Sequence, residues 1–469
     1  MKIIKSIVAL PFAFLILTLS SCSLDPIIAD QGDTQIQDLS DLRTLMDGSY
    51  NLMVNYRYWG RNMIIAGEVR SDNTFSNGKS NRYPNWSKMD LNERNERVEN
   101  LFNYAYASVA NPNIILNDTD LDNKINQQNI QNKNYILGEA YAIRALAHFD
   151  LLRTFGQTYL NEGENLGVPY MLEFKGSQGN NVPRNTVEEN QMQIYKDIAA
   201  AINAFKNAAS SSYNGDKTRM SLDATYALQS RVGIYFKDYD YAYEGSKEIA
   251  DKYPVTSAQN YVSYWASQTP GPASIFELEQ NPTDNQGQNN IGYIYRGIKL
   301  GDIEVFRTLF DDAQFEVTDI RFSSEMIRED SGRLRNMGKY PATDESGHDN
   351  IKVFRIEEVI LNHAEALFLK STPQPAEALV YLNKIPENRN ATSYATIGID
   401  HILQERRKEL LFEGFRLFDL ARYNLDIKDM DPSTVNNHGL VEAGSYRFAF
   451  PIPRHEMDSN KAMKQNPGY

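Results

Sequence analysis

Residues 405–420 read ERRKELLFEGFRLFDL, and this stretch constrains the fold more than any other part of the 469-residue chain. Its apolar residues fall on most sides of a helical projection, which predicts a buried helix over residues 400–423. A buried helix cannot leave its charges unpaired, because an isolated charge in an apolar interior is costly. We therefore expect Glu413 to pair with Arg416, and Asp419 with Arg422, each three residues apart.

Further helices are predicted on both sides of a second buried segment. Residues 137–152 read LGEAYAIRALAHFDLL, which is rich in alanine and leucine and predicts a buried helix over residues 135–155 that Gly156 closes. Helical spacing also predicts a helix that begins at Asp38, one over residues 101–116, and one that Thr186 caps.

Two helical hairpins are predicted in the middle and late parts of the chain. Residues 223–236 and 242–252 form the first, and residues 357–369 and 376–384 form the second. In both, a small residue stands 12 positions before an alanine: Ser230 before Ala242, and Ala364 before Ala376. Tetratricopeptide repeats have this spacing, because their helices cross closely only where side chains are small. The pattern predicts two tetratricopeptide-like units in a mainly α fold.

Two long stretches break the helical periodicity. Residues 67–90 and 255–345 are rich in Gly, Asn, Ser and Pro, which mark turns and loops. Within the second stretch, the alternation over residues 274–280 predicts one strand. Long irregular segments in a large chain often carry function, so candidate binding residues are sought there.

The amino terminus has the pattern of a secretory signal. Lys2 and Lys5 precede an apolar run from Ile7 to Leu19, which is too short to span a bilayer, and residues 19–22 read LSSC. The only cysteine of the chain, Cys22, therefore stands where bacterial lipoproteins are cleaved and acylated. We predict a signal peptide over residues 1–21 and a lipidated polar tether over residues 22–37; an ordinary secreted protein is the alternative.

Composition excludes several classes of protein. A single cysteine cannot form an intramolecular disulfide framework, and a chain of this length can bury a large core without one. The net charge of −13 argues against nucleic acid as a partner and against adsorption to anionic lipid headgroups. Contact with a membrane must then come from the lipid on Cys22.

A series of short motifs is spread over almost the whole chain. They are Cys22 to Asp25, Glu139 to Leu151, Gly167 to Pro169, Arg184 to Glu189, Arg355 to Leu367, Glu405 to Arg416, Phe450 to Pro453 and Gln465 to Tyr469. In this order they resemble the SusD/RagB family of outer-membrane nutrient-binding lipoproteins, and together they are far more specific than any one of them.

The resemblance implies a fold, a partner and a place in the cell. The fold would be mainly helical, with tetratricopeptide-type helix pairs forming a superhelical scaffold under a loop-rich ligand-binding face. Residues 38–469 would form one domain, with an N-terminal portion to about residue 255 and a C-terminal portion from about 256. The protein would bind oligosaccharides, or peptides, and deliver them to a SusC-type TonB-dependent barrel. It would be lipid-anchored in the outer membrane, facing the cell exterior.

No enzyme signature is present in the sequence. The chain lacks a nucleophile elbow, a phosphate-binding loop, a zinc-binding His-Glu-x-x-His helix and paired cysteines. His148 and His363 fall on predicted buried helices, where hydrogen-bonded core histidines are expected. No cofactor or metal is expected, and binding is favoured over catalysis. A surface hydrolase or a structural adaptor remains the alternative, because 61 acidic residues could hide a catalytic pair.

Candidate ligand-binding residues come from the irregular stretches, where exposed aromatic rings would have no core to fill. Aromatic faces shed water against sugar C–H groups, while Asn, Asp and Arg hydrogen-bond to hydroxyl groups. Trp59 is assigned to the core instead. The alternative is that the candidates pack within their own loops. The candidates form two clusters: Asp72, Asn73, Arg82, Tyr83 and Trp86, and then Tyr264, Trp265, Tyr293 and Tyr295.

Overall fold

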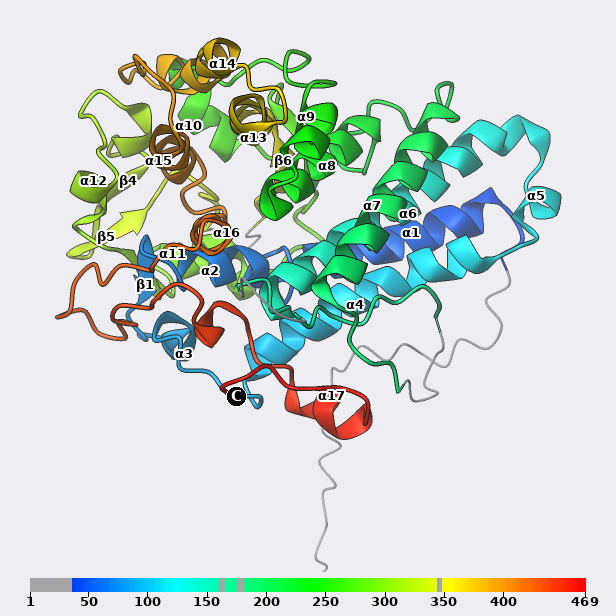
Figure 1. The fold of residues 1–469 in the computed structure, drawn as a ribbon, viewed down its shortest axis with the longest axis horizontal. Coiled ribbons are helices and arrows are strands. Elements are labelled where there is room, and N and C mark those ends of the chain that lie inside the picture. The colour runs from blue at the N-terminus through cyan, green and yellow to red at the C-terminus, as the bar shows by residue number, and fades with distance from the viewer. Residues whose placement is uncertain (1–35, 160–164, 175–180, 344–347) are drawn as a thin grey trace, which may run out of the picture.

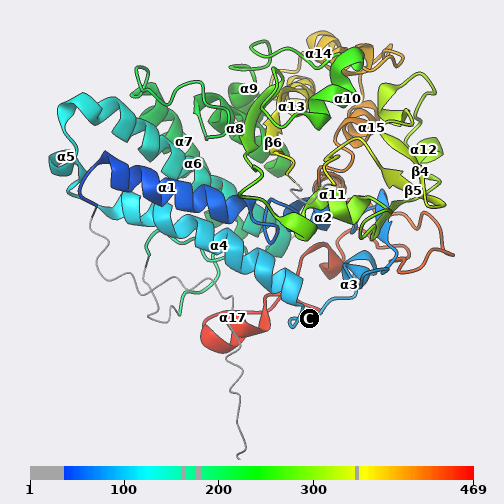
Figure 2. The same ribbon diagram turned by 180° about the vertical axis from the view of Figure 1, so that it is seen from behind.

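The computed structural model describes residues 36–159, 165–174, 181–343 and 348–469. The expected signal peptide, Cys22 and tether residues 22–35 therefore lie outside the described residues. Within them the protein is mainly helical, as the sequence predicts, and Figures 1 and 2 show long helices at one end and shorter helices with short strands at the other. No helix in this described part is both long and apolar enough to cross a membrane.

Four long helices lie side by side in the first half of the chain (Figures 1 and 2). The two predicted N-terminal caps are confirmed: Asp38 and Thr186 each accept from the third backbone N–H of their helix in a capping box. Arg144 and Asp197 join two of the helices through a buried ion pair of 2.7 Å. The four are α1 (Leu39–Val54), α4 (Glu96–Asn117), α6 (Ile130–Phe155) and α7 (Val187–Lys206), with the short α5 (Leu121–Lys124) between α4 and α6.

Two helical hairpins follow, and they pack on each other. They are α8 (Leu222–Phe236) with α9 (Tyr239–Ser246), and α13 (Ile356–Leu369) with α14 (Pro375–Glu387). The first hairpin crosses closely at Gly233 rather than at Ser230, since a Cβ on Gly233 would stand 2.8 Å from that of Ala242. The predicted role of Ala376 is wrong, because Ala376 is exposed and Ala378 is the buried residue of that helix.

Three pairs of short strands lie within the described residues. All three pairs are antiparallel and two-stranded, and the predicted strand is confirmed as β2. The pairs are β1 (Thr74–Ser76) with β3 (Ile303–Val305), β2 (Ser274–Leu278) with β6 (Ile351–Arg355), and β4 (Ile327–Asp330) with β5 (Arg333–Asn336). The remaining helices are α2 (Asn62–Glu68), α3 (Pro84–Ser87), α10 (Ala258–Ala266), α11 (Ile291–Tyr295), α12 (Leu309–Asp312), α15 (Ile399–Glu409), α16 (Arg416–Arg422) and α17 (Arg454–Ser459).

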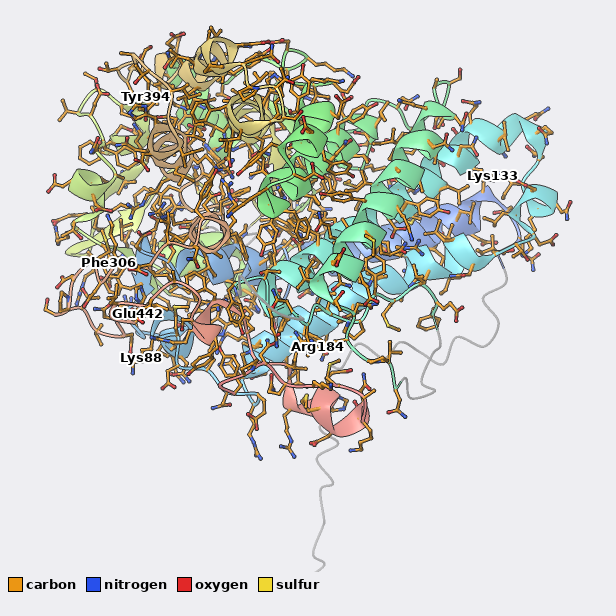
Figure 3. The ribbon with its side chains drawn as sticks, viewed as in Figure 1. Lys88, Lys133, Arg184, Phe306, Tyr394 and Glu442 are labelled. Carbon is orange, nitrogen blue, oxygen red and sulfur yellow. The ribbon has the colours of Figure 1, made fainter. Side chains whose placement is uncertain are left out.

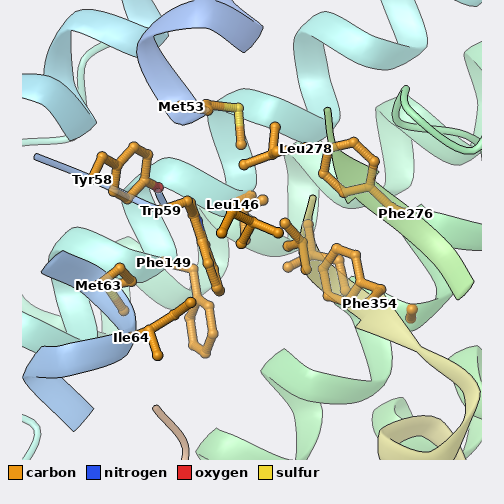
Figure 4. Close-up of a cluster of buried hydrophobic side chains, with 14 of the residues drawn as sticks. Met53, Tyr58, Trp59, Met63, Ile64, Leu146, Phe149, Phe276, Leu278 and Phe354 are labelled. Atoms are coloured by element: carbon orange, nitrogen blue, oxygen red, sulfur yellow. The ribbon is translucent and has the colours of Figure 1, made fainter. Parts of the chain in front are cut away.

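Trp59 lies in the core, as its assignment predicts. Figure 4 shows its ring beside Phe149 and Leu146 of α6, and it is 3% exposed. Both Trp59 Nε1 and Tyr58 Oη donate to one carboxylate oxygen of Asp150, at 2.8 and 2.7 Å. These two hydrogen bonds satisfy the polar ends of two large buried rings, and they fix the chain just after α1.

The prediction of one continuous helix over residues 400–423 is wrong in its middle part. The chain leaves the helix after α15 and restarts at α16, with Phe412 at φ 70° and Gly414 at φ 84° between them. The turn is forced by close packing, because a Cβ on Gly67 of α2 would stand 2.0 Å from the carbonyl oxygen of Gly414.

The break changes one of the two predicted ion pairs. Asp419 and Arg422 pair at 2.8 Å, as predicted, but Glu413 and Arg416 do not pair with each other. Glu413 instead receives hydrogen bonds from Arg355 at 2.7 and 2.8 Å, while Arg416 turns to a different partner described below.

Glu409, at the end of α15, is the centre of a buried ion-pair network. Its carboxylate accepts from Arg355 at 2.7 Å, from Arg389 at 2.9 Å through both oxygens, and from Arg321 at 3.1 Å. Burial alone would raise the pKa of Glu409, but these three guanidiniums outweigh it and hold the pKa well below its ordinary value. The network fastens β6, the end of the α13–α14 hairpin and the irregular segment near residue 321 to one helix.

Removing the charge of Glu409 should weaken the fold strongly. Glu409→Gln is expected to lower the free energy of unfolding at pH 7 by about 3–5 kcal/mol, because it leaves buried guanidiniums without their counter-charge. Urea unfolding measures the loss, with Glu387→Gln on the exposed end of α14 as the control.

The pH dependence has a definite sign. A depressed carboxyl pKa stabilises the folded state above the unfolded pKa of roughly 4.3, and this stability is lost as pH falls. We expect the urea concentration at the midpoint of wild-type unfolding to decrease as the pH is lowered below about 4.3. In Glu409→Gln this midpoint should decrease less steeply with pH. Parallel pH profiles would contradict this role for Glu409.

Candidate ligand-binding site

Asp72 and Asn73, from the first predicted cluster, are buried and engaged by arginines of the late helices. Arg416 donates to Asp72 at 2.7 and 2.8 Å, and Arg407 Nε donates to Asn73 at 2.8 Å. Burial raises the pKa of Asp72, yet Arg407 and Arg416 together hold it well below its ordinary value. The expectation that these two side chains face solvent is wrong, since they fasten the 67–76 segment to α15 and α16.

Trp86 is also an interior residue. It is 1% exposed, and its ring lies 5.1 Å from that of Tyr83 and 4.9 Å from that of Phe450, between centroids. Its Nε1 donates to Asn95 at 3.2 Å. Trp86 therefore cannot offer a free ring face to a sugar. Arg82, by contrast, is half-buried, and within the part of the chain that the structure describes its guanidinium donates only to Ser80.

The second predicted cluster is buried as well, which corrects the same expectation. Trp265 is 1% exposed, and its ring packs against Tyr340 and three cationic side chains. Tyr264 donates to or accepts from Ser274 in the interior, and Tyr295 packs on Phe412. Parts of the irregular segments between the hairpins thus belong to the core, and these aromatic rings fill it. The four predicted residues, Tyr264, Trp265, Tyr293 and Tyr295, are all less than 8% exposed.

A different set of side chains forms a row that alternates guanidinium groups with tyrosine rings. The Cζ of Arg57 and that of Arg61 each lie 4.6 Å from the ring centroid of Tyr56. The ring of Tyr83 stands 5.6 Å from Arg61 Cζ and 5.5 Å from Arg97 Cζ. We call these five residues the arginine–tyrosine row. Tyr56, Arg57 and Arg97 are half-buried, whereas Arg61 and Tyr83 are buried.

The local sequence explains how the row is held. The chain turns sharply after α1, and Gly60 permits the turn, because a Cβ there would stand 2.1 Å from the carbonyl oxygen of Val54. Tyr83 occupies a left-handed conformation, φ 62°, just before Pro84 starts α3. Its hydroxyl donates to Asn62 at 2.7 Å. Figure 2 shows α2, α3 and α11 on the side of the molecule away from α5, where these segments meet.

The electrostatics of the row are unusual for this acidic chain. Among the described residues, no carboxylate oxygen lies within 4.0 Å of the guanidinium of Arg57, Arg61, Arg82 or Arg97. Burial lowers the pKa of Arg61, and the charges of Arg97 and Arg82 lower it further. Arg61 donates to Asn62 and to Asn289, which are neutral acceptors. The row is therefore a local concentration of positive charge.

A hollow of about 380 Å³ is lined by Phe75 and by residues 304–307, 332–334 and 431–435. Figure 3 places Phe306, on its floor, at the end of the molecule opposite Lys133. The ring centroids of Phe75 and Phe306 lie 5.0 Å apart in this hollow. Its rim charges are already paired, Arg333 with Glu304 at 3.4 Å, for example. It is therefore the weaker candidate for a charged or hydroxylated ligand.

Sequence reasoning missed Tyr56, Arg57, Arg61 and Arg97. The signal was the run YRYWGR over residues 56–61, in which aromatic and arginine residues alternate directly after a predicted helix. Arg97 carried no signal, because it lies in an ordinary helical pattern and reaches the row only through the packing of α4.

The two histidines assigned to the core are confirmed there. His148 Nδ1 donates to the carbonyl oxygen of Arg144 while Nε2 accepts from Met171 N–H, and burial lowers the pKa of His148 to about 4. Burial lowers the pKa of His363 to about 4 as well, and its Nδ1 is 2.8 Å from Ser246 Oγ. In the described residues, no three His, Cys, Asp or Glu side chains gather to hold a metal ion.

The interior position of Trp86 and Trp265 gives a stability prediction. Trp86→Ala and Trp265→Ala are each expected to lower the free energy of unfolding by about 3–5 kcal/mol, because each leaves a large cavity. Urea unfolding measures this, and Met192→Ala, at a half-exposed position of α7, is the matched control. A loss no larger than that of the control would contradict the burial of these rings.

Comparison with known proteins identifies relatives along the whole chain. A family model described as "Starch-binding associating with outer membrane" matches residues 30–234, and one described as "SusD family" matches residues 330–469. SusD-like protein P38 of Formosa agariphila is 24% identical, over 96% of this chain and 96% of its own length.

Two further relatives bear on the fold and on part of the sequence. The starch-binding protein SusD of Bacteroides thetaiotaomicron is 30% identical over 144 residues, which are 29% of this chain and 24% of that protein. A crystal structure of a SusD superfamily protein from Bacteroides vulgatus is 25% identical, covers 92% of this chain and all of that chain, and superposes with a TM-score of 0.81. The chain belongs to the SusD/RagB family.

Proposed function

We propose that this protein is a cell-surface lipoprotein that binds oligosaccharides at the arginine–tyrosine row and passes them to a SusC-type TonB-dependent transporter. It acts as a binding protein and not as an enzyme. The observation that carries the proposal is the row itself, since its cations are held against ring faces and have no carboxylate partner among the described residues.

The chemistry of the row suits sugars. A guanidinium group has five N–H donors, and one that lies over an aromatic face keeps its edge for other acceptors. Sugar hydroxyl groups are such acceptors, and the half-buried ring of Tyr56 offers an apolar surface to sugar C–H groups. The family description "Starch-binding associating with outer membrane" supports the same class of ligand.

Two of the residues first selected from the sequence belong to this site. Arg82 flanks Arg61, and Tyr83 lies within the row. We assign the others to the interior that supports it: Asp72, Asn73, Trp86, Tyr264, Trp265, Tyr293 and Tyr295.

The anchor and the ligand site would lie at different places on the body. α1 has 16 residues and is thus about 24 Å long. The tether joins its first turn, and the row follows its last. A ligand could therefore bind without contact with the lipid headgroups.

Acylation of Cys22 is tested directly. In a Gram-negative host, Cys22→Ala is expected to abolish labelling by a radioactive fatty acid and to release the protein from the membrane fraction, because the thiol is the acylated atom. Ser23→Ala serves as the control. Membrane association that survives Cys22→Ala would reject the lipid anchor.

Binding at the row is tested by removing single cations. After screening against a panel of glycans, Arg57→Ala and Arg97→Ala are each expected to weaken the best ligand by about 1–3 kcal/mol in calorimetric titration, because each loses charge-assisted hydrogen bonds. Arg328→Ala, an exposed arginine on β4, is the control. Unchanged affinity in both row variants would reject this site.

Two other outcomes would change the proposed function but keep the proposed site. Cleavage of a glycan during incubation with the protein would indicate a hydrolase. Peptides that co-purify with the native protein, and that compete with glycans for the row, would indicate a peptide-binding member of the family.

A further inference from the structure

The charge balance at the row is the reverse of that of the whole chain. The protein carries a formal charge of −13, yet Arg57, Arg61, Arg82 and Arg97 stand together with no carboxylate oxygen within 4.0 Å among the described residues. Elsewhere acids are abundant, and most buried arginines of α15 and its neighbours have one or more. The absence of acids at this place is therefore a local feature.

Two other buried arginines without carboxylates, Arg296 and Arg184, have satisfied their donors in a different way, whereas buried Arg70 keeps Nε and Nη1 without a hydrogen-bond partner among the described residues. Arg296 donates to the main-chain carbonyl oxygens of residues 336, 337, 339 and 340, and Arg184 donates to those of residues 155, 166, 167 and 464. These two arginines link separate backbone segments and have few N–H donors left for a ligand. Their lack of an acid needs no ligand to explain it.

The donors of the row remain largely unused. Among the described residues, the guanidinium of Arg57 makes one hydrogen bond, to Tyr104 Oη at 3.1 Å, and that of Arg82, which flanks the row, makes one, to Ser80 Oγ at 2.8 Å. The guanidinium of Arg97 makes none to another described residue and is only half-buried. Donor-rich cations with both open donors and no counter-charge are suited to bidentate contact with a carboxylate or a sulfate.

Mutual repulsion favours the same kind of ligand. Arg57 and Arg61 share one ring, and Arg61 and Arg97 share the other, so the cations are close neighbours. Like charges at such separations destabilise each other, and a bound anion would relieve the repulsion, whereas a neutral sugar would not. The hollow lined by Phe75 and Phe306 lacks this property, because its two arginines, Arg307 and Arg333, are paired with glutamates.

We propose that the arginine–tyrosine row selects oligosaccharides bearing anionic groups, carboxylates or sulfate esters, over neutral oligosaccharides of the same length. This inference rests on the proposed function, since it names the class of sugar that the same site takes. The rings orient the guanidinium groups, and the anionic group of the sugar supplies the counter-charge that the protein does not.

Matched sugars test the proposal. One pair is tetragalacturonate and its carboxyl-reduced form, and the other is a sulfated carrageenan tetrasaccharide and its desulfated form. Wild-type protein is expected to bind at least one acidic member about tenfold or more tightly than its neutral partner in calorimetric titration. Arg97→Gln should remove most of that preference, because it should lower the affinity for the acidic member far more than the affinity for the neutral member, and Arg328→Gln should leave both unchanged.

The outcomes separate this inference from the proposed function. Equal affinity for acidic and neutral members, with both weakened in Arg57→Ala and Arg97→Ala, would overturn the charge selectivity and keep the sugar-binding site. Binding that neither variant weakens would overturn the site itself. The pair that shows the preference tells whether carboxylate or sulfate is the group recognised.

A measurement on the free protein checks the repulsion. The melting temperature of Arg97→Gln relative to wild type is expected to be higher at 10 mM than at 1 M sodium chloride, because salt screens the repulsion that the substitution removes. The short-range contact with Tyr83 is lost at both salt concentrations and cancels from this difference. A relative melting temperature that rises with salt would mean that Arg97 already has an acidic partner, and would overturn the proposal.

Discussion

The carboxylate of Glu409 is the point on which the C-terminal half of the fold depends. Three guanidiniums, from Arg321, Arg355 and Arg389, converge on it in an interior that excludes water. Such a cluster is stable only when every member is present, because removal of one charge leaves the others unpaired. This cluster holds β6, the end of the α13–α14 hairpin and the irregular segment near residue 321 against α15, so parts of the segments between the hairpins are buried.

That constraint explains why the ligand site lies elsewhere. With the irregular segments buried, their aromatic rings fill space between helices and cannot receive a sugar. Polar and aromatic side chains reach the surface together where α1 ends, and the sharp turn at Gly60 brings Tyr56, Arg57 and Arg61 alongside Tyr83. The acidic side chains of the scaffold thus pair with interior arginines, whereas the arginines of the row have no carboxylate partner among the described residues. The same distribution of acidic side chains therefore contributes to the stability of the fold and to the positive charge of the site.

Sequence patterns predicted the elements of the fold better than the residues of the site. Helical spacing and capping residues located α1, α6, α7 and both hairpins, because those signals are local. The break between α15 and α16 depends on the approach of Gly67 from a distant segment, which periodicity cannot register. The same limit misled the search for ligand residues: composition marks residues 67–90 as loop, but only packing decides whether Trp86 is exposed. Arg97 joins the row purely through tertiary structure.

A crystal structure of the protein with a bound oligosaccharide would test the central claim most directly. The account predicts a sugar whose oxygen atoms lie within hydrogen-bonding distance of the guanidinium groups of Arg57 and Arg97, with a ring face of the sugar against Tyr56. A sugar seated in the hollow beside Phe306, with the arginine–tyrosine row empty, would contradict it.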